Sequence, residues 1–113
     1  MELDHVAVVV SNIAASVDWY RQQLGAEVLY ADETWAFLRL GQGKLALVMA
    51  HQHPPHVAVR LDQAALQQLA SQMNTTIDKH RDGTQGFYFR DLDGNVIEII
   101  SYPPGQTAYE KPV

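Results

Sequence analysis

The sequence predicts an α+β fold in which two paired βαβββ modules form a curved eight-stranded sheet. Three observations support this prediction. The tetrapeptide His-Val-Ala-Val stands at residues 5–8 and again at residues 56–59. A helical pattern of apolar residues follows each copy, and the segment 36–48 aligns with the segment 86–98 at nearly the same offset. Because both matches are separated by nearly the same number of residues, they indicate an internal repeat of about fifty residues.

The size of the chain fits one domain. With 113 residues, of which 47% are hydrophobic, it is long enough for one core and too short for two independent domains. We therefore expect one domain over 1–113, with module one at 1–50, a linker at 51–55 and module two at 56–102. The tail at 103–113 has little periodicity and is expected to be a loose arm.

The composition excludes several classes of partner. The net charge is -5 and Lys and Arg form no run, so a nucleic-acid partner is not expected. No apolar run reaches the roughly 20 residues that span a bilayer, and the first residues are not basic, so we expect no membrane partner and a cytoplasmic protein. The absence of cysteine leaves His, Asp and Glu as the strong metal ligands.

The first module reads as one strand, one helix and three strands. Residues 5–10 are rich in β-branched side chains, which favour a strand. Ser11 or Asn12 is expected to cap a helix that ends at Gly25. The spacing of apolar residues supports this helix. The three strands are expected at 27–31, 35–40 and 44–50.

The second module repeats this plan. A strand is expected at 56–61, and Asp62 is expected to cap the following helix. The two prolines of the linker lie where their missing N–H groups cost nothing. Three further strands are expected near 76–80, 87–90 and 95–101.

Strand periodicity predicts where the polar side chains point. Side chains alternate across a strand, so His5 and His56 lie opposite the aliphatic residues that follow them. Glu98 stands between two isoleucines, and a buried carboxylate is costly unless a cation or hydrogen-bond donors meet it. If the aliphatic faces pack on the helices, then His5, Val48, His56 and Glu98 point into one cup.

His5, His56 and Glu98 are therefore predicted to bind a divalent metal ion. Two neutral imidazoles and a carboxylate, with positions left open, suit Fe2+ and Mn2+ best, and Ni2+, Co2+ or Zn2+ are possible. An open position indicates chemistry or ligand chelation rather than a structural metal. The alternatives are that each histidine is a surface or hydrogen-bonded residue and that Glu98 pairs with Arg60 or Arg90.

Four segments resemble a known family. They are residues 3–8 (LDHVAV), residues 16–25 (SVDWY through LG), residues 56–59 (HVAV) and residues 87–98 (FYFRDLDGNVIE). The chain is similar to the vicinal oxygen chelate superfamily, which includes glyoxalase I, extradiol dioxygenases, fosfomycin-resistance thiol transferases, methylmalonyl-CoA epimerase and bleomycin-binding proteins. The resemblance implies the paired βαβββ fold, a metal-centred cup, and a homodimer in which modules are sometimes exchanged.

The resemblance narrows the reaction in part. Glyoxalase I has a fourth ligand, a Glu, where this chain has Val48, which disfavours a standard glyoxalase I site. The spacing of the extradiol dioxygenase motif is matched by His80, Phe87, Tyr88, Asp91, Gly94 and Glu98. Leu92 replaces the expected Pro, and Asp78 replaces a small or apolar residue. No histidine stands beside Val48, where these enzymes place an acid/base, although His51 or His53 could substitute.

The resemblance also bears on fosfomycin. Ala7 and Asp82 stand where a Thr and a Ser are expected in the fosfomycin transferases, and Asp78 stands where a Lys is expected. Fosfomycin is therefore not the expected substrate. The expected function is a metal-dependent enzyme that chelates a small substrate through adjacent oxygens, most like an extradiol dioxygenase or a glyoxalase-type lyase or isomerase. The alternative is a metal-free, drug-binding protein of the bleomycin-resistance type.

Supporting roles are predicted for five further residues. Tyr88 would donate a hydrogen bond or proton near the metal, and His80 would act as acid or base. Arg60 would bind a substrate carboxylate. Trp35 and Phe37 would line the pocket. The alternatives are core packing for the three aromatic residues, an exposed strand end for His80, and an acidic partner for Arg60.

Overall fold

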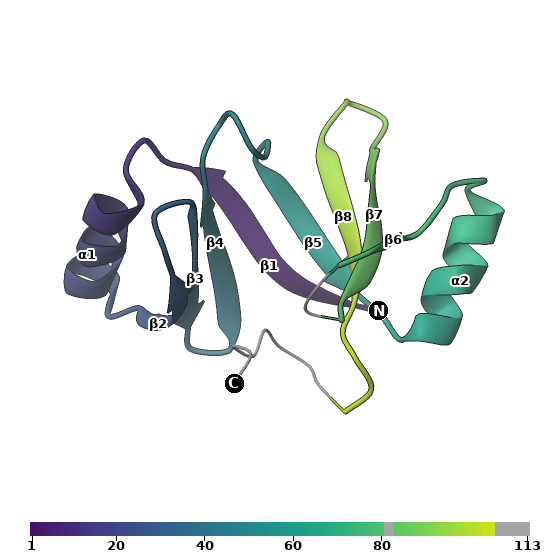
Figure 1. The fold of residues 1–113 in the computed structure, drawn as a ribbon, viewed down its shortest axis with the longest axis horizontal. Helices are drawn as coiled ribbons and strands as arrows, with labels where there is room; N and C mark the ends of the chain where they lie inside the picture. Colours follow the sequence, from purple (N-terminus) through teal and green to yellow (C-terminus); the bar gives the residue numbers. More distant parts are fainter. Residues whose placement is uncertain (81–82, 106–113) are drawn as a thin grey trace. The chain divides into compact units, whose positions relative to one another are not determined.

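The computed structural model describes residues 1–80 and 83–105, and the predictions for Asp82 and for the end of the tail lie outside these residues. The elements follow the order βαβββ twice, which confirms the α+β class. The elements are β1 (Glu2–Val9), α1 (Ile13–Leu24), β2 (Glu27–Ala31), β3 (Trp35–Leu40), β4 (Gly43–Val48), β5 (His56–Arg60), α2 (Gln63–Gln72), β6 (Asp78–Lys79), β7 (Gln85–Arg90) and β8 (Val96–Ser101) (Figure 1).

The eight strands follow the hydrogen-bonded order β2-β3-β4-β1-β5-β8-β7-β6. The chain divides into two compact units, described below as the His5–His56 unit and the C-terminal unit, which combines Met1–Asp4 with the chain from Val57 onward. Strand β1 contributes to both units. The predicted boundaries of the two modules are not tested by this division and stay a prediction.

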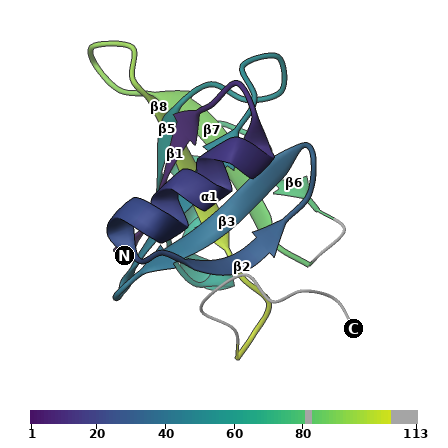
Figure 2. The same cartoon turned by 90° about the vertical axis from the view of Figure 1, so that its left-hand side faces the viewer.

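In the His5–His56 unit, α1 packs against β2, β3 and β4 (Figure 2). The side chain of Asn12 accepts a hydrogen bond of 2.9 Å from the N–H of Ala15, which caps the first turn as predicted. Gly25 ends the helix with φ 66°, a left-handed conformation that glycine adopts without strain. Strand β4 pairs parallel with β1 and antiparallel with β3.

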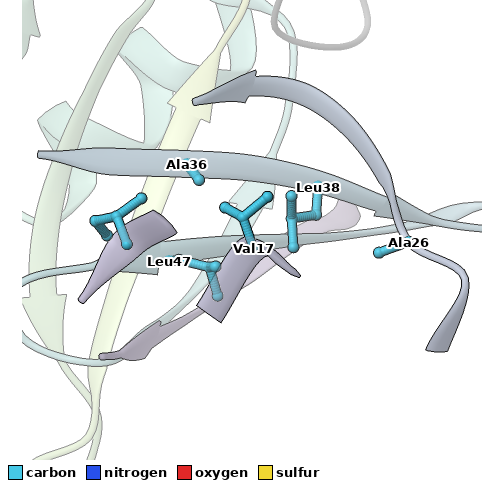
Figure 3. Packing of buried hydrophobic residues seen from close by; sticks show 6 residues of the cluster. Val17, Ala26, Ala36, Leu38 and Leu47 are labelled. Atoms are coloured by element: carbon cyan, nitrogen blue, oxygen red, sulfur yellow. The ribbon is translucent and has the colours of Figure 1, made fainter. Parts of the chain in front are cut away.

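The core of this unit lies between α1 and the sheet (Figure 3). Its buried members are Ile13, Val17, Ala26, Ala36, Leu38 and Leu47. Because side chains alternate along β3, Trp35 and Phe37 lie on the face opposite Ala36 and Leu38. The helix therefore covers the aliphatic face, and the aromatic side chains occupy the other face.

The C-terminal unit follows the same plan. Asp62 caps α2 by accepting a 2.8 Å hydrogen bond from the N–H of Ala65, and β8 pairs parallel with β5 and antiparallel with β7. The core beside α2 is made of Leu66, Ala70, Phe87 and Ile99. Tyr88 follows Phe87, Glu98 precedes Ile99, and Tyr88 is paired directly with Glu98. Because side chains alternate along a strand, Tyr88 and Glu98 both lie on the face opposite α2.

Several boundaries differ from the predictions. Strand β1 begins at Glu2 rather than His5, and Asp4, within this extension, is buried and accepts a hydrogen bond from the Tyr102 hydroxyl. Strand β6 has two residues rather than five, and both are exposed. Strand β4 ends at Val48, two residues early. Among the described residues, no helix has the length and apolar character needed to cross a membrane.

Candidate metal centre

The two predicted histidine ligands lie together in the His5–His56 unit. His5 lies on β1 and His56 opens β5. Their ring centroids are 5.7 Å apart, with an angle of 71° between the ring planes. His56 is buried and His5 is half-buried. The repeat in the sequence therefore brings two imidazoles into ring contact, as expected.

The hydrogen bond made by His56 fixes its tautomer. Its Nδ1 lies 2.9 Å from the carbonyl oxygen of Pro54. A carbonyl only accepts, so Nδ1 carries the proton, and in the neutral ring the lone pair lies on Nε2. Metal-binding histidines are typically oriented in this way, by a hydrogen bond from the nitrogen that does not bind the metal. The sequence does not predict Pro54 as a site residue. The one sequence signal at this position is Pro55, which restricts Pro54 to an extended conformation.

An aromatic row extends from His5 across the same face. The ring of Phe37 meets His5 edge-on at 5.2 Å, and Trp35 lies 5.9 Å from Phe37. Trp35 in turn stacks on Tyr30 at 4.9 Å, and the Lys44 ammonium lies 5.6 Å from the centroid of Phe37. Trp35 and Phe37 thus lie on the face of the first histidine. Contact of these residues with a substrate stays a prediction.

The predicted carboxylate ligand lies at the centre of the C-terminal unit. Glu98 is buried, with 6% of its surface exposed. Its partner on β5 is Ala58, which is fully buried. Its partner on β7 is Tyr88, whose hydroxyl is hydrogen-bonded to the Glu98 carboxylate. Tyr88 is therefore a direct neighbour of Glu98, on the face that the sequence predicts.

The environment of Tyr88 keeps its hydroxyl protonated. Burial raises the pKa of Tyr88 well above its usual value, and the charge of Glu98, the hydrogen bond to Glu98 and the charge of Asp78 raise this pKa further. The hydroxyl is therefore a hydrogen-bond donor throughout the neutral range. This donor supplies part of the compensation that a buried carboxylate requires.

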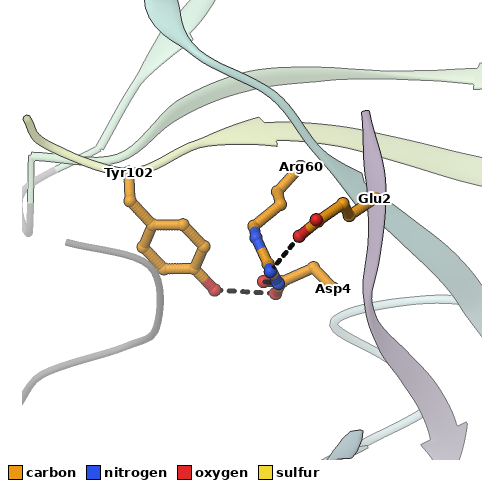
Figure 4. Close-up of polar contacts among 4 residues, drawn as sticks. All are labelled: Glu2, Asp4, Arg60 and Tyr102. Atoms are coloured by element: carbon orange, nitrogen blue, oxygen red, sulfur yellow. Dashed lines mark hydrogen bonds and ion pairs between the residues drawn. The ribbon is translucent and has the colours of Figure 1, made fainter.

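Arg60 lies in an acidic cluster of the C-terminal unit (Figure 4). Its Nη1 is 3.4 Å from the Asp4 carboxylate, and its Nη2 pairs with Glu2. The hydroxyl of Tyr102 donates a hydrogen bond of 2.7 Å to the second oxygen of Asp4. This arrangement is the acidic-partner alternative for Arg60. Binding of a substrate carboxylate by Arg60 stays a prediction.

His80 lies at the exposed end of the β6–β7 hairpin. Its Nδ1 is 2.9 Å from the hydroxyl oxygen of Thr84, and its backbone N–H donates to the Thr84 carbonyl at 2.9 Å. This position matches the strand-end alternative. The acid or base role of His80 stays a prediction. His53, assigned to the linker, lies with its ring centroid 6.4 Å from that of His56.

A family model described as the Glyoxalase/Bleomycin resistance protein/Dioxygenase superfamily matches residues 2–99. The chain belongs to this superfamily. Two relatives are proteins named metallothiol transferase FosB, from Staphylococcus haemolyticus and Staphylococcus epidermidis. Each is 30% identical over 112 residues, and each match covers 86% of this chain and 81% of the relative.

Solved structures of low identity have the same fold as this superfamily member. Methylmalonyl-CoA epimerase from Mycobacterium tuberculosis has a TM-score of 0.72 at 19% identity, over 91% of this chain and 89% of the epimerase. The hypothetical protein BH1468 from Bacillus halodurans C-125 has a TM-score of 0.73 at 17% identity, over 93% and 96% of the two chains. Both likenesses concern the fold alone.

The residue types predicted as metal ligands are ones that a divalent ion accepts. The His5–His56 unit supplies two imidazoles, one of which has its tautomer fixed by Pro54. The C-terminal unit supplies one buried carboxylate with a phenolic donor beside it. Imidazole nitrogen and carboxylate oxygen are ligands that Fe2+, Mn2+, Co2+, Ni2+ and Zn2+ accept.

Proposed function

We propose that this chain is a divalent-metal-dependent enzyme of the Glyoxalase/Bleomycin resistance protein/Dioxygenase superfamily, with His5, His56 and Glu98 as the ligands of one ion. Each residue offers one ligand atom. The observation that carries the proposal is the His56 imidazole, which donates from Nδ1 to Pro54 while its ring contacts His5. The name metallothiol transferase, which the 30% identical relatives bear, supports metal dependence.

Three protein ligands leave positions for a substrate. Fe2+ and Mn2+ are favoured for a site with two imidazoles and one carboxylate. When bound, the ion would supply Lewis-acid polarisation of substrate oxygens. Two adjacent oxygens on the substrate would match this arrangement, and we propose a small substrate of that kind.

The residues of the chain itself would bind and orient this substrate. Tyr88 would use its protonated hydroxyl as a donor, since its pKa is raised and its half-exposed ring reaches the surface of the C-terminal unit. Trp35 and Phe37 would offer aromatic surface beside His5. His80 is proposed as a further acid or base and Arg60 as a carboxylate contact. We further propose a homodimer, in which the modules could be exchanged between chains.

The leading reaction classes are ring-cleaving dioxygenation and a glyoxalase-type lyase or isomerase reaction. Thiol transfer is a second candidate, and the 30% identity to metallothiol transferases favours it. Fosfomycin itself is disfavoured as the substrate. Ala7 and Asp78 carry no hydroxyl or ammonium group where the fosfomycin enzymes are expected to have a Thr and a Lys.

Metal titration tests the proposal. Protein purified without an affinity tag and stripped with a chelator is titrated with Mn2+, or with Fe2+ under anaerobic conditions, in a calorimeter. We expect one ion per chain, and a loss of affinity of at least about 100-fold in Glu98→Gln and His56→Ala, because removing a ligand costs more than the 10- to 100-fold typical of its supporting residues. Glu27→Gln and His80→Ala are the matched controls and keep the affinity.

The outcome of the titration separates the function classes. If the unmodified chain binds no divalent ion, the metal-free binding alternative replaces the enzyme. If Glu98→Gln binds as the unmodified chain does, the ligand set is wrong. Once metal binding is established, oxygen consumption with catechols indicates a dioxygenase, turnover of hemithioacetals without oxygen indicates a lyase or isomerase, and loss of thiol in the presence of an epoxide indicates a transferase.

A further inference from the structure

A polar network surrounds the buried carboxylate of Asp4 in the C-terminal unit and includes residues of β1, of β5 and of the segment just after β8. The carboxylate of Asp4 uses both oxygens, one toward the Tyr102 hydroxyl at 2.7 Å and one toward Arg60 Nη1 at 3.4 Å. The Asp4 side chain has 0% exposure, and that of Arg60 has 28%. Glu2 pairs with the second terminal nitrogen of Arg60 (Figure 4). The buried Asp4 carboxylate is therefore met by one hydroxyl and by one cation, which it shares with Glu2.

One member of this network lies on, or just after, each strand that carries a proposed ligand. Asp4 immediately precedes His5 on β1. Arg60 stands four residues after His56 on β5, and Tyr102 stands four residues after Glu98, just past the end of β8. The pairing of β5 with β8 places Arg60 opposite Ile100 and Ala58 opposite Glu98. The network thus fixes the positions of the ligand-bearing strands close to the ligands themselves.

We propose that Asp4, Arg60 and Tyr102 are positioning residues that fix the register of β1 and so orient His5 for metal binding. This inference rests on the proposed function and deepens it. None of the three is a ligand, and none belongs to the apolar core beside α2. Their effect on the metal would pass through the position of a strand.

The energetics of the network supply the physical reason. A slip of one residue would turn the side chain of His5 to the other face of β1, because side chains alternate along a strand. The same slip would carry the Asp4 carboxylate away from Tyr102 and Arg60 and leave a buried charge without partners, which is strongly unfavourable. The register that satisfies Asp4 is therefore strongly preferred, and it is the register in which the His5 ring contacts His56.

Two conservative variants test the inference. Tyr102→Phe removes one hydroxyl, and Asp4→Asn removes the charge while keeping the shape. We expect each to weaken Mn2+ binding about tenfold or more, as is typical when a residue supporting a metal ligand is removed. The double variant should lose little more than either single variant, since the residues act as one unit. The matched control is Arg39→Met, which breaks an exposed ion pair with Glu27 on β2 and β3 and should leave the affinity unchanged.

A second measurement separates positioning from general stability. Amide hydrogen exchange of the metal-free protein should show reduced protection in residues 2–9 of both variants, while β2 and β3 keep theirs. Affinity unchanged in both Tyr102→Phe and Asp4→Asn overturns the inference, and so does exchange that rises evenly over the whole chain. If Asp4→Asn does not fold, Tyr102→Phe alone decides. Loss of binding in Glu98→Gln is measured separately, so the proposed metal site can stand even if this inference fails.

Discussion

The hydroxyl of Tyr88 is hydrogen-bonded to the carboxylate of Glu98, its direct partner across the β7–β8 pair. A ligand carboxylate that accepts such a bond is held in one orientation before any ion arrives. Because the pKa of Tyr88 is raised, the hydroxyl remains the donor in this pair at neutral pH. Tyr88 is therefore expected to support Glu98 as a proposed metal ligand, whether or not Tyr88 also touches substrate.

Tyr88→Phe should keep the fold and weaken metal binding. The ring is 41% exposed and does not contribute to the core beside α2, so its hydroxyl is removed at little cost to packing. We expect Mn2+ affinity to fall about tenfold, measured by calorimetric titration. Tyr20→Phe, on α1, is the matched control. Equal affinity in the two variants would show that Tyr88 does not orient Glu98.

Two tyrosines should resist ionisation in alkali. Burial is the largest cause that raises the pKa of both Tyr88 and Tyr102, and the nearby carboxylates of Glu98 and Asp4 raise it further. In absorbance titrations at 295 nm, these two residues should ionise at higher pH than in denaturant, where the ordinary value of about 10 applies. The single variants Tyr88→Phe and Tyr102→Phe assign each delayed ionisation to its residue.

The same shifts predict how stability depends on pH. The folded pKa of each tyrosine lies above its unfolded value, so the stabilising contribution is complete below the unfolded pKa and is lost as the pH rises through the folded one. The free energy of unfolding should therefore fall as the pH is raised above about 10. In the double variant Tyr88→Phe, Tyr102→Phe this decline should be shallower. If stability declines as steeply in the double variant as in the unmodified chain, groups other than these two tyrosines cause the decline.

Most of the fold was predictable because its determinants are local. Asn12 and Asp62 cap the N-termini of the two helices, and Gly25 caps the C-terminus of α1. These positions follow from capping chemistry within a few residues of each helix end. The alternation that separates Phe87 from Tyr88 is read directly from the strand period. The ring contact between His5 and His56 is predictable from the repeated tetrapeptide, which places one histidine at the same position of each module.

What the sequence left unpredicted depends on distant partners. Glu2 and Asp4 carry no β-propensity signal, and their side chains bond to Arg60 and Tyr102, which are 56 to 98 residues away. The Pro54 carbonyl that fixes the tautomer of His56 is a backbone atom, and a side-chain pattern gives no sign of it. The sequence predicts a metal ion as the partner of Glu98, and the structure adds the Tyr88 hydroxyl as a hydrogen-bond partner of the same carboxylate.

Gly86→Ala should destabilise the C-terminal unit strongly. A Cβ at residue 86 would lie 2.1 Å from the carbonyl oxygen of Ile99, a backbone atom that cannot move without disturbing β8. We expect the free energy of unfolding, measured by urea titration, to fall by about 2 kcal/mol or more, as is usual for overpacked sites. Gly43→Ala is the matched control, since its closest neighbour would lie at 3.5 Å. Similar stability in both variants would contradict the close approach of β7 to β8.

Ser101→Ala should leave the protein equally stable or make it more stable. The Ser101 side chain is completely buried, and its hydroxyl has no hydrogen-bond partner within the described part of the chain. Replacing an unsatisfied buried hydroxyl with a methyl group removes a desolvation cost, and a gain of about 1 kcal/mol in unfolding free energy is expected. A loss of similar size in urea titration would show that the hydroxyl is bonded.

The division of β1 between the two units has a consequence for biosynthesis. Residues 5–56 are contiguous, so they can assemble while the remaining chain is still on the ribosome. Residues 2–4 are translated before Arg60 and Tyr102, the residues that Glu2 and Asp4 contact in the folded protein. A nascent chain arrested before Tyr102 would thus carry an assembled His5–His56 unit and an incomplete C-terminal unit, and such a partly folded species is prone to aggregate.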